Sequence, residues 1–451
     1  MKKKQPTKII LFGHFGSGNH GNEATLLAIV SRLRVLLPNC ELRCICSFPE
    51  HVAPRYGVEA IPHTVRAVRI WDREVPLGRR MRMAVIGLAE EIGEYARIWR
   101  TVAGADMFVV PGTGALTDAF GLSGWGPYGV FKWTLMAKLR RCRPMFVSVG
   151  AGPVRTGWGR AFLRIAFALA DYRSYRDVPS SKAVEGSLFR TRRDEIYPDL
   201  VFGLPSPAAT KASAGPRSRA VVGIGLMEYA PGYSVTNPLG NTYERYLESL
   251  AGLVNWLIEQ EHDVKLLLGD SDAGVVADLR RVLSDRFGPA VRDRVAYRPT
   301  LHVDELLEEL STTDLMVATR FHNILMSLLL DKPVVAVSFH DKCSALMRQM
   351  GLSEYVNDMS TIDTDSLIAQ FQDLSANADE LRELIRHGVE ASREALEEQY
   401  ELLFGGGVSS EERAADAVPA ATSSRVAGGD WLSEGMPPAH DAVRRGGATL
   451  G

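Results

Sequence analysis

The sequence predicts an α/β protein with two Rossmann-like domains that face each other across a cleft. Short apolar runs alternate with amphipathic helical patterns along most of the chain. Glycine turns follow several of these runs, and a stretch rich in Pro, Ala, Ser and Gly interrupts the alternation near the middle. Alternating strands and helices build parallel sheets covered by helices on both faces, and their ligands bind outside the carboxyl ends of the strands. This arrangement is similar to that of type-B glycosyltransferases.

Apolar runs in the first half of the chain predict the first sheet. We place strands at 8–12, 41–46, 107–110, 145–149 and 172–175, and helices at 23–36, 79–102, 129–140 and 160–170. Residues 1–205 are therefore predicted to form an N-terminal domain. The segment that follows is rich in Pro, Ala and Ser, which predicts a linker at 206–218.

The same alternation restarts after the linker and predicts a C-terminal domain at 219–375. Its strands are expected at 220–226, 264–268, 294–297, 315–318 and 334–338, and its helices at 243–261, 273–286, 303–311, 321–330 and 342–350. The charged helical pattern at 365–403, which includes a C-terminal helix at 376–404, is expected to pack across the domain junction. Residues 405–451 have few large apolar side chains and are predicted to be a disordered tail.

Composition excludes several classes of protein. A net charge of −2 over 451 residues argues against a general nucleic-acid binder and against binding to an anionic membrane through bulk charge. The five cysteines are too sparse for a disulfide framework. Cys44 and Cys46 would share one face of a strand, but no second pair or nearby histidine completes a metal site. We therefore predict buried, reduced cysteines and no metal.

The N-terminal basic residues are followed by an apolar run that is too short for a signal peptide and that ends in glycine. No apolar stretch is long enough to span a bilayer. The helical pattern at 79–102 contains Glu90, Glu91 and Glu94, so it is amphipathic. These features predict a cytoplasmic protein without an integral membrane segment. The alternative is a peripheral position at the inner membrane face, where the protein would contact the membrane only through its substrate.

Three glycine-rich turns follow predicted strands, at 13–23, 111–118 and 150–153. The first resembles a dinucleotide fingerprint, in which glycines let the backbone approach a ligand at a helix N-terminus. Asn19 and Glu23 are candidates to contact a hydroxylated ligand, the alternative being a tight turn with Asn22 as the helix cap. In the second turn, Thr113 and Gly114 form a flexible loop. Asp118 either holds a sugar hydroxyl, acts as a base or caps a turn.

Two further motifs follow strands of the second half. In Thr319-Arg320-Phe321-His322, Thr319 is predicted to cap a helix whose first turn holds Arg320, a bidentate ligand for phosphate or carboxylate. His322, near the positive helix end, is predicted to be a neutral imidazole suited to general-base catalysis. The alternative is that Arg320 pairs with an acid and His322 packs in the core. The motif at 338–342 adds Lys342, another candidate cation for an anion.

These motifs together resemble the polysaccharide pyruvyl transferase family. The segment through Asn19, Gly21 and Glu23 is similar to that family's GNxGDE loop, with Asn22 in place of aspartate. The turns at 113–118 and 150–153, Arg176-Asp177 and Pro198-Asp199 match further family motifs in order. The most specific match is the Arg-Phe-His motif at 320–322, followed by the Pro-Val-Val strand at 333–338 and Asp341-Lys342. The resemblance covers about residues 8–355.

The resemblance implies transfer of a pyruvyl group from phosphoenolpyruvate to two hydroxyls of a sugar in a cell-surface glycan precursor, giving a cyclic ketal. It implies no cofactor beyond this co-substrate and no metal. His322 and Arg320 are the implied catalytic residues. Arg320, Lys342, Arg176 and Thr319 would bind the donor, and Asn19, Glu23, Thr113, Gly114 and Asp118 would bind the acceptor, either a free glycan or a lipid-linked sugar. Two alternatives remain: a nucleotide-sugar glycosyltransferase of the same architecture, and a non-catalytic glycan-assembly protein.

Overall fold

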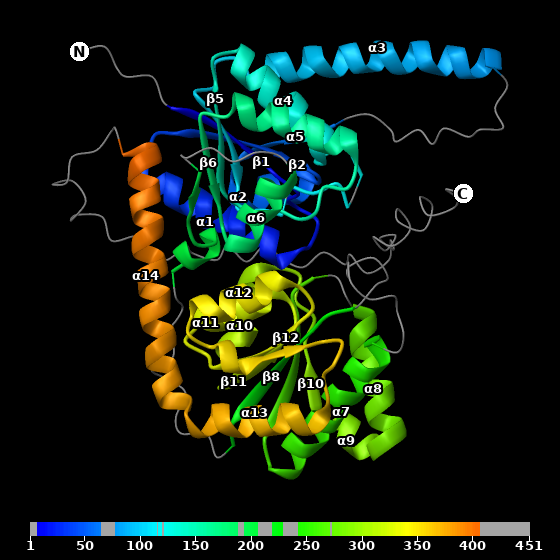
Figure 1. The fold of residues 1–451 in the computed structure, drawn as a ribbon, viewed down its shortest axis with the longest axis vertical. Helices are drawn as coiled ribbons and strands as arrows, with labels where there is room; N and C mark the ends of the chain where they lie inside the picture. Colours follow the sequence, from blue (N-terminus) through cyan, green and yellow to red (C-terminus); the bar gives the residue numbers. More distant parts are fainter. Residues whose placement is uncertain are drawn as a thin grey trace. The chain divides into compact units, whose positions relative to one another are not determined.

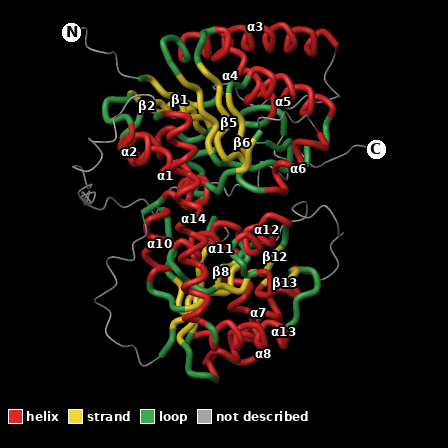
Figure 2. The backbone as a smooth tube through the Cα atoms, turned by 60° about the vertical axis from the view of Figure 1, so that its left-hand side comes forward, coloured by secondary structure: helices red, strands yellow, loops and turns green. Residues whose placement is uncertain are grey.

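The computed structural model describes residues 7–64, 77–114, 116–119, 121–187, 194–205, 219–228, 242–270 and 273–405, with the backbone alone for 77–85. This part of the chain forms two parallel β-sheets, each covered by helices, which confirms the predicted fold class (Figures 1 and 2). The predicted linker at 206–218 and all but the first residue of the predicted tail lie outside the described residues.

The first sheet has seven parallel strands in the order β3-β2-β1-β4-β5-β6-β7. They are β1 (Lys8–Phe12), β2 (Glu41–Cys46), β3 (Glu59–Pro62), β4 (Met107–Pro111), β5 (Arg143–Val149), β6 (Tyr172–Tyr175) and β7 (Glu195–Ile196). Along β1, Ile9 and Leu11 join one buried cluster while Ile10 and Phe12 join another. Successive side chains of a strand point to opposite faces, so the apolar run of β1 fits a strand buried on both sides.

Helices cover both faces of this sheet. One face packs on α1 (His20–Leu36) and α2 (Pro49–Tyr56). The other packs on α3 (Leu77–Thr101), α4 (Pro127–Leu139) and α5 (Gly157–Leu169) through Ile98, Trp133 and Phe167. Helix α6 (Val178–Ser187) follows β6, and the short 3-10 helix η1 (Leu200–Gly203) contacts α1. The carboxyl ends of β1, β4, β5 and β6 therefore lead into the turns that the sequence singled out.

The second sheet has six parallel strands in the order β10-β9-β8-β11-β12-β13. They are β8 (Val221–Leu226), β9 (Asp263–Leu268), β10 (Val295–Tyr297), β11 (Leu315–Ala318), β12 (Val334–Ser338) and β13 (Val356–Asp358). Its helices are α7 (Thr242–Glu259), α8 (Ala273–Phe287), α9 (Pro289–Asp293), α10 (Val303–Ser311), α11 (Phe321–Leu329) and α12 (Asp341–Gln349). The 3-10 helix η3 (Ser353–Tyr355) precedes β13. Helix α11 therefore begins directly beyond the carboxyl end of the central strand β11.

The last two helices, α13 (Thr364–Ala376) and α14 (Ala378–Phe404), connect the two sheets. Helix α14 contacts α11 and α13 in the second half of the chain and η1 in the first. Near its end, Gln399 accepts a hydrogen bond from Ser148 Oγ at 3.1 Å and donates one to Ser174 Oγ at 2.7 Å. Arg393 donates to the carbonyl of Phe202. Through these contacts, α14 packs against elements of both halves of the chain.

All ten predicted strands are present, each within two residues of its predicted ends. The sequence did not predict β3, β7 and β13, which are edge strands or short segments of two to four residues, nor α2, α6 and α9. Two helices were predicted to begin three residues too late, because α1 starts at His20 and not at residue 23, and α5 starts at Gly157 and not at residue 160. In the described part of the chain, no helix is long and apolar enough to cross a membrane.

Candidate active site

Two of the three glycine turns of the first sheet lie against residues of one charged cluster. A methyl group added at Gly21 would overlap the imidazole of His322. One added at Gly150 would lie 2.9 Å from Cζ of Arg176. Gly21 and Gly150 therefore allow the backbone to approach His322 and Arg176, which come from separate segments of the chain. Gly112, in the remaining turn, faces Thr25 and Leu200 instead.

His322 is the second residue of α11 and lies with its ring against the first turn of α1. Its Nε2 atom is buried without a hydrogen-bond partner among the described residues, and the nearest acid, Asp199 Oδ2, is 4.0 Å away. Burial, followed by the positive charges of Arg176, Lys342 and Arg320, lowers the pKa of His322 well below its usual value. The imidazole is therefore neutral as predicted, although burial and cations cause this more than the helix end alone.

Arg176 is a buried cation that carboxylates already compensate. It follows β6 and forms ion pairs with Asp177 Oδ2 at 3.2 Å and with Asp199 Oδ2 at 3.1 Å. Burial opposes its charge, but Asp199 and Asp177 outweigh burial and raise the pKa of Arg176. The guanidinium stacks over the ring of Phe321 at 4.5 Å. Arg176 thus connects the turn after β6 to the beginning of α11.

Lys342 is a cation without such compensation. It lies at the beginning of α12, where its backbone N–H donates to Nδ1 of the cap residue His340 at 3.3 Å. Its Nζ atom lies 5.8 Å from the ring centre of Phe321 and 5.4 Å from that of Phe339. No ion pair of Lys342 occurs among the described residues. Burial, with a further contribution from Arg176, lowers the pKa of Lys342 to about 8.

Arg320 belongs to a polar chain that joins the two halves of the protein. Its Nη1 atom lies 3.2 Å from Asp270 Oδ2, which also accepts a hydrogen bond from Asn19 Nδ2 at 2.7 Å. Asp270 follows β9, and Asn19 caps α1 by accepting from the backbone N–H of Asn22. The part of the alternative in which Arg320 pairs with an acid is therefore correct.

The prediction that Thr319 caps α11 is wrong. Arg320 occupies the cap position and makes no side-chain capping bond. The hydroxyl of Thr319 instead pairs with Tyr246 Oη at 2.9 Å in the interior of the second domain. This leaves the first backbone N–H groups of α11 without a side-chain cap, beside Arg320 and His322.

The polar residues of the first glycine turn are largely occupied by the turn itself. Glu23 accepts hydrogen bonds from the backbone N–H of Gly16 at 2.6 Å and from Tyr56 Oη at 2.8 Å, and burial raises its pKa. The predicted alternative cap, Asn22, is wrong because the cap is Asn19. Asn22 instead donates through Nδ2 to the carbonyl of His14 at 3.0 Å. An aspartate, typical of the family at this position, could not make that bond when ionised.

In the second turn, the side chain of Asp118 is hydrogen-bonded, whereas that of Thr113 is not bonded to any described residue. Asp118 accepts hydrogen bonds from the backbone N–H groups of Arg155 and Thr156 and from Thr156 Oγ1, at 2.6–2.9 Å. Partial burial alone would raise the pKa of Asp118, but these bonds outweigh burial and lower it. Thr113 is buried, and its hydroxyl has no partner among the described residues. Gly114 has open space where a side chain would be.

Three further polar residues of the site were not among the predicted ones. Asp199 and Asp270 position Arg176 and Arg320. Asn323 is fully buried, has no hydrogen-bond partner among the described residues, and fills the space left by Gly225 and Gly269 at the ends of β8 and β9. Asp270 could have been predicted by the criterion used for the other site residues, because it follows the end of a strand and a glycine. In the described residues, no group of His, Cys, Asp and Glu could hold a metal ion.

Comparison with known sequences identifies related proteins. A family model described as polysaccharide pyruvyl transferase matches residues 19–341, which include the end of the first glycine turn, the turns at 111–118 and 150–153, and the Arg320-Phe321-His322 motif. The amylovoran biosynthesis protein AmsJ of Erwinia amylovora is 22% identical over 419 residues, which span 86% of this chain and 96% of that protein.

Comparison with solved structures identifies the fold. Anabaena HepE in complex with UDP matches with a TM-score of 0.55 at 11% identity, over 88% of this chain and all of that one. The UDP-GlcNAc 2-epimerase of Neisseria meningitidis bound to UDP-GlcNAc matches with a TM-score of 0.50 at 12% identity, over 88% and 99% of the two chains. A glycosyltransferase from Rickettsia africae has a TM-score of 0.51 at 11% identity, over 89% and 99%. These chains share an architecture with this one.

Proposed function

The chain belongs to the polysaccharide pyruvyl transferase family, and on this basis we propose that it moves a pyruvyl group from phosphoenolpyruvate to two hydroxyls of a sugar, forming a cyclic ketal. The observation that carries the proposal is the neutral imidazole of His322, whose Nε2 atom is buried, beside Lys342, which forms no ion pair among the described residues. A donor with a phosphate and a carboxylate requires cations, and its reaction with a hydroxyl requires a base.

The donor is proposed to bind at the beginning of α11. Lys342 and Arg320 would hold the phosphate and the carboxylate, together with the backbone N–H groups of the helix that no side chain caps. Because two carboxylates enclose Arg176, we propose that it acts mainly through Phe321 and Asp199, by fixing the first turn of α11 and the surroundings of His322.

The proposed reaction conserves protons. A proton adds to the methylene carbon of phosphoenolpyruvate, and one sugar hydroxyl attacks the adjacent carbon. The bond from that carbon to the phosphate oxygen then breaks, and the second hydroxyl attacks to close the ketal. Of the two hydroxyl protons, one replaces the proton taken up by the methyl group and the other leaves with phosphate. His322, which starts neutral, would accept the first hydroxyl proton.

The acceptor is proposed to approach from the second glycine turn. Thr113 has an unpaired hydroxyl and Gly114 leaves open space, whereas Asn19, Glu23 and Asp118 hold the turns in shape. AmsJ is named for amylovoran biosynthesis, which supports a precursor of an exopolysaccharide as the acceptor class. A donor drawn from central metabolism would place the reaction in the cytoplasm.

The experiment that tests this function compares two donors. The full chain is incubated with an oligosaccharide carrying a free vicinal or 1,3-diol, and with either phosphoenolpyruvate or a nucleotide sugar. We expect phosphate release and a mass gain of one pyruvyl ketal with phosphoenolpyruvate alone. Transfer from the nucleotide sugar alone would establish the glycosyltransferase alternative. No transfer from either donor across a panel of diol acceptors, with the protein folded, would favour a non-catalytic role.

A further inference from the structure

Helices α3, α4 and α5 expose an unusual share of large apolar side chains. Among the described residues, seven of the fourteen exposed large apolar side chains lie on these three helices. We define the helical-layer face by six of them: Leu88, Ile92 and Trp99 on α3, Leu139 on α4, and Trp158 and Ile165 on α5. Leu88 and Ile92 are 64% and 63% exposed, and Trp158 is 70% exposed. Patches of this kind mark interaction sites.

These side chains belong to one continuous layer. Helix α4 contacts both α3 and α5, and all three cover the same face of the first sheet (Figure 1). On α3, the side chains at 88, 92 and 99 recur at helical spacing, and no described side chain between Ile86 and Gly93 is buried. On α5, Phe162 stacks against Trp158 at 6.1 Å and against Phe131 of α4 at 5.3 Å. This aromatic packing connects α5 to α4 along the layer.

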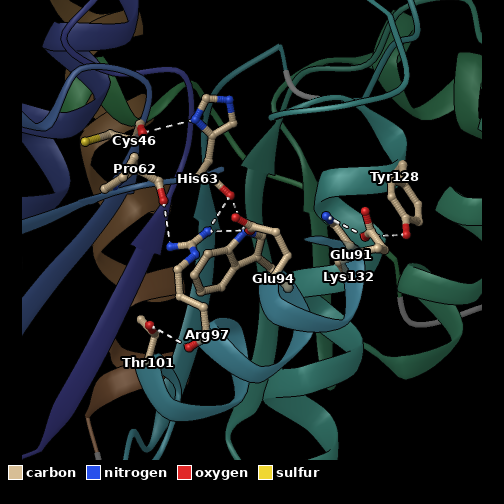
Figure 3. A network of polar contacts seen from close by, with 10 residues as sticks. Cys46, Pro62, His63, Glu91, Glu94, Arg97, Thr101, Tyr128 and Lys132 are labelled. Atoms are coloured by element: carbon tan, nitrogen blue, oxygen red, sulfur yellow. Dashed lines mark hydrogen bonds and ion pairs between the residues drawn. The ribbon is translucent and has the colours of Figure 1, made fainter. Parts of the chain in front are cut away.

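Glu91 and Glu94 of α3 each bond to a neighbouring cation, as Figure 3 shows. Glu94 pairs with Arg97 at 2.8 Å, and Arg97 also donates to the carbonyls of Pro62 and His63. Glu91 accepts from Lys132 Nζ at 3.0 Å and from Tyr128 Oη at 2.7 Å, both on α4. The bonds of Glu91 fix α3 on α4, and cations compensate both carboxylates.

The exposed charges of the layer are mainly positive. Arg100, Arg141 and Arg164 are exposed, and the guanidinium of Arg140 stacks over the ring of Trp99 at 4.7 Å. The sequence of α5 contains two arginines and no acid. A second copy of the chain would bring this basic layer against itself in a symmetric dimer, where like charges repel. An anionic surface that accepts protruding apolar and aromatic side chains avoids that repulsion.

We propose that the helical-layer face docks on an anionic phospholipid bilayer. Leu88, Ile92, Trp99, Trp158 and Ile165 would enter the boundary between headgroups and acyl chains, and the flanking arginines would contact lipid phosphates. Helix α5 begins at the turn that Asp118 holds, beside the proposed acceptor loop. The layer would thus place that loop close to the membrane. Docking itself does not depend on the proposed reaction.

The test is flotation of the full chain with vesicles of phosphatidylcholine alone or of an equimolar mixture with phosphatidylglycerol, without any substrate. We expect binding to the mixed vesicles that weakens as salt is raised. The double variant Trp158→Asp/Ile92→Asp should lower the partition coefficient at least about tenfold, since each side chain loses membrane burial. Arg100→Glu/Arg141→Glu should lower it by a similar factor.

The matched control is Leu301→Asp/Leu402→Asp, which changes two side chains that are 74% and 63% exposed and lie outside the layer. This control should bind vesicles as the wild type does. Equal binding to neutral and mixed vesicles, or equal loss in the control, would overturn the proposal. A concentration-dependent dimer in light scattering that only Trp158→Asp/Ile92→Asp abolishes, without vesicle binding, would identify a second copy as the occupant instead.

Discussion

The two sides of the candidate site use polar residues in different ways. On the first-sheet side, the side chains of Asn19, Glu23 and Asp118 each accept a hydrogen bond from at least one backbone N–H group. On the second-sheet side, His322 Nε2 has no hydrogen-bond partner, and Lys342 has no acidic partner among the described residues. The first group stabilises the turns of the fold by hydrogen bonding. The second group loses contact with water on folding, and no hydrogen bond or ion pair within the described residues compensates for that loss.

This difference indicates where the chemistry resides. Buried titratable groups with displaced pKa values and unsatisfied atoms are costly, so they persist where a ligand completes them. Polar residues in tight turns are common because turns require side-chain acceptors for backbone N–H groups. The same residue types at similar strand-end positions therefore differ in role, and their contacts distinguish them. Four variants examine this contrast.

Apart from replacement of His322 itself, the largest effect is expected for Gly21→Ala, because Gly21 lies on the first-sheet side and faces His322 on the second-sheet side. The added methyl group would overlap the His322 imidazole and force the ring away. A displacement of about 1 Å at a catalytic group costs about 100-fold in rate, so kcat should fall by about that factor. Steady-state kinetics measure kcat, and a melting curve checks the fold. Gly93→Ala, at a glycine with open space, is the control. A Gly21→Ala enzyme with nearly wild-type kcat would contradict the placement of His322.

Next in size is Lys342→Met, which removes the uncompensated cation. Hydrogen bonds to charged groups are worth about 1.5–3 kcal/mol, so KM for phosphoenolpyruvate should rise about 10- to 100-fold. Lys138→Met, which removes a surface lysine paired with Asp171, should leave KM unchanged and serves as the control. An unchanged KM in Lys342→Met would remove this residue from the donor site.

Lys342→Met should also be more stable to unfolding than the wild type near neutral pH. The pKa of Lys342 is about 8 in the folded protein and 10.5 in its ordinary state, so the folded protein binds this proton more weakly than the unfolded chain. The resulting destabilisation is complete below pH 8 and is relieved as pH rises to 10.5. Lys342→Met should therefore melt at a higher temperature than wild type at pH 7, with a smaller difference at pH 10.

A smaller effect is expected in the pH dependence of kcat/KM for phosphoenolpyruvate. Deprotonation of Lys342 should lower kcat/KM for phosphoenolpyruvate by about tenfold as pH rises through about 8. Because arginine stays charged, Lys342→Arg should move this decline to higher pH. The pKa of His322 lies well below its usual value, so this group should cause no decline on the acid side until pH falls below 6.5. A decline near pH 8 that persists in Lys342→Arg would assign it to another group.

The smallest effect on catalysis is expected for Asp118→Ala. It removes three hydrogen bonds around the beginning of α5, which should lower the free energy of unfolding by about 1–2 kcal/mol. Its kcat should stay within a few-fold of wild type. The matched variant is Asp363→Ala, which removes the cap of α13 far from the site. Denaturant titrations compare the two. A rise in acceptor KM in Asp118→Ala alone would restore Asp118 as an acceptor ligand.

Much of the fold was predictable because strands buried on both faces appear as apolar runs. Strands β1, β8, β11 and β12 have this property, whereas edge strand β3 (EAIP) has only two apolar residues between a glutamate and a proline. The glycine turns were also predictable, since parallel strands end at the same edge of a sheet. Their convergence on Arg176 and His322 agrees with that expectation.

The partners of the polar residues were not predictable. Asn19 bonds Asp270 across 251 residues, and nothing local to either motif indicates the other. The predicted cap of α1 was wrong because Asn19 and Asn22 are both asparagines, which favour caps. The sequence alone does not show at which of the two the helix begins. Thr319 directly follows a strand, as many cap residues do. Its hydroxyl is instead hydrogen-bonded to that of Tyr246, which is distant in the sequence.

The most direct test measures kcat and the free energy of unfolding side by side for His322→Asn and Asp118→Ala, with phosphoenolpyruvate and a diol acceptor. If catalysis belongs to the second-sheet side, His322→Asn should lose about 10²- to 10⁴-fold in kcat and keep its stability. Asp118→Ala should lose stability and keep its kcat. A His322→Asn enzyme with wild-type turnover, or an Asp118→Ala enzyme that is stable but inactive, would contradict the account.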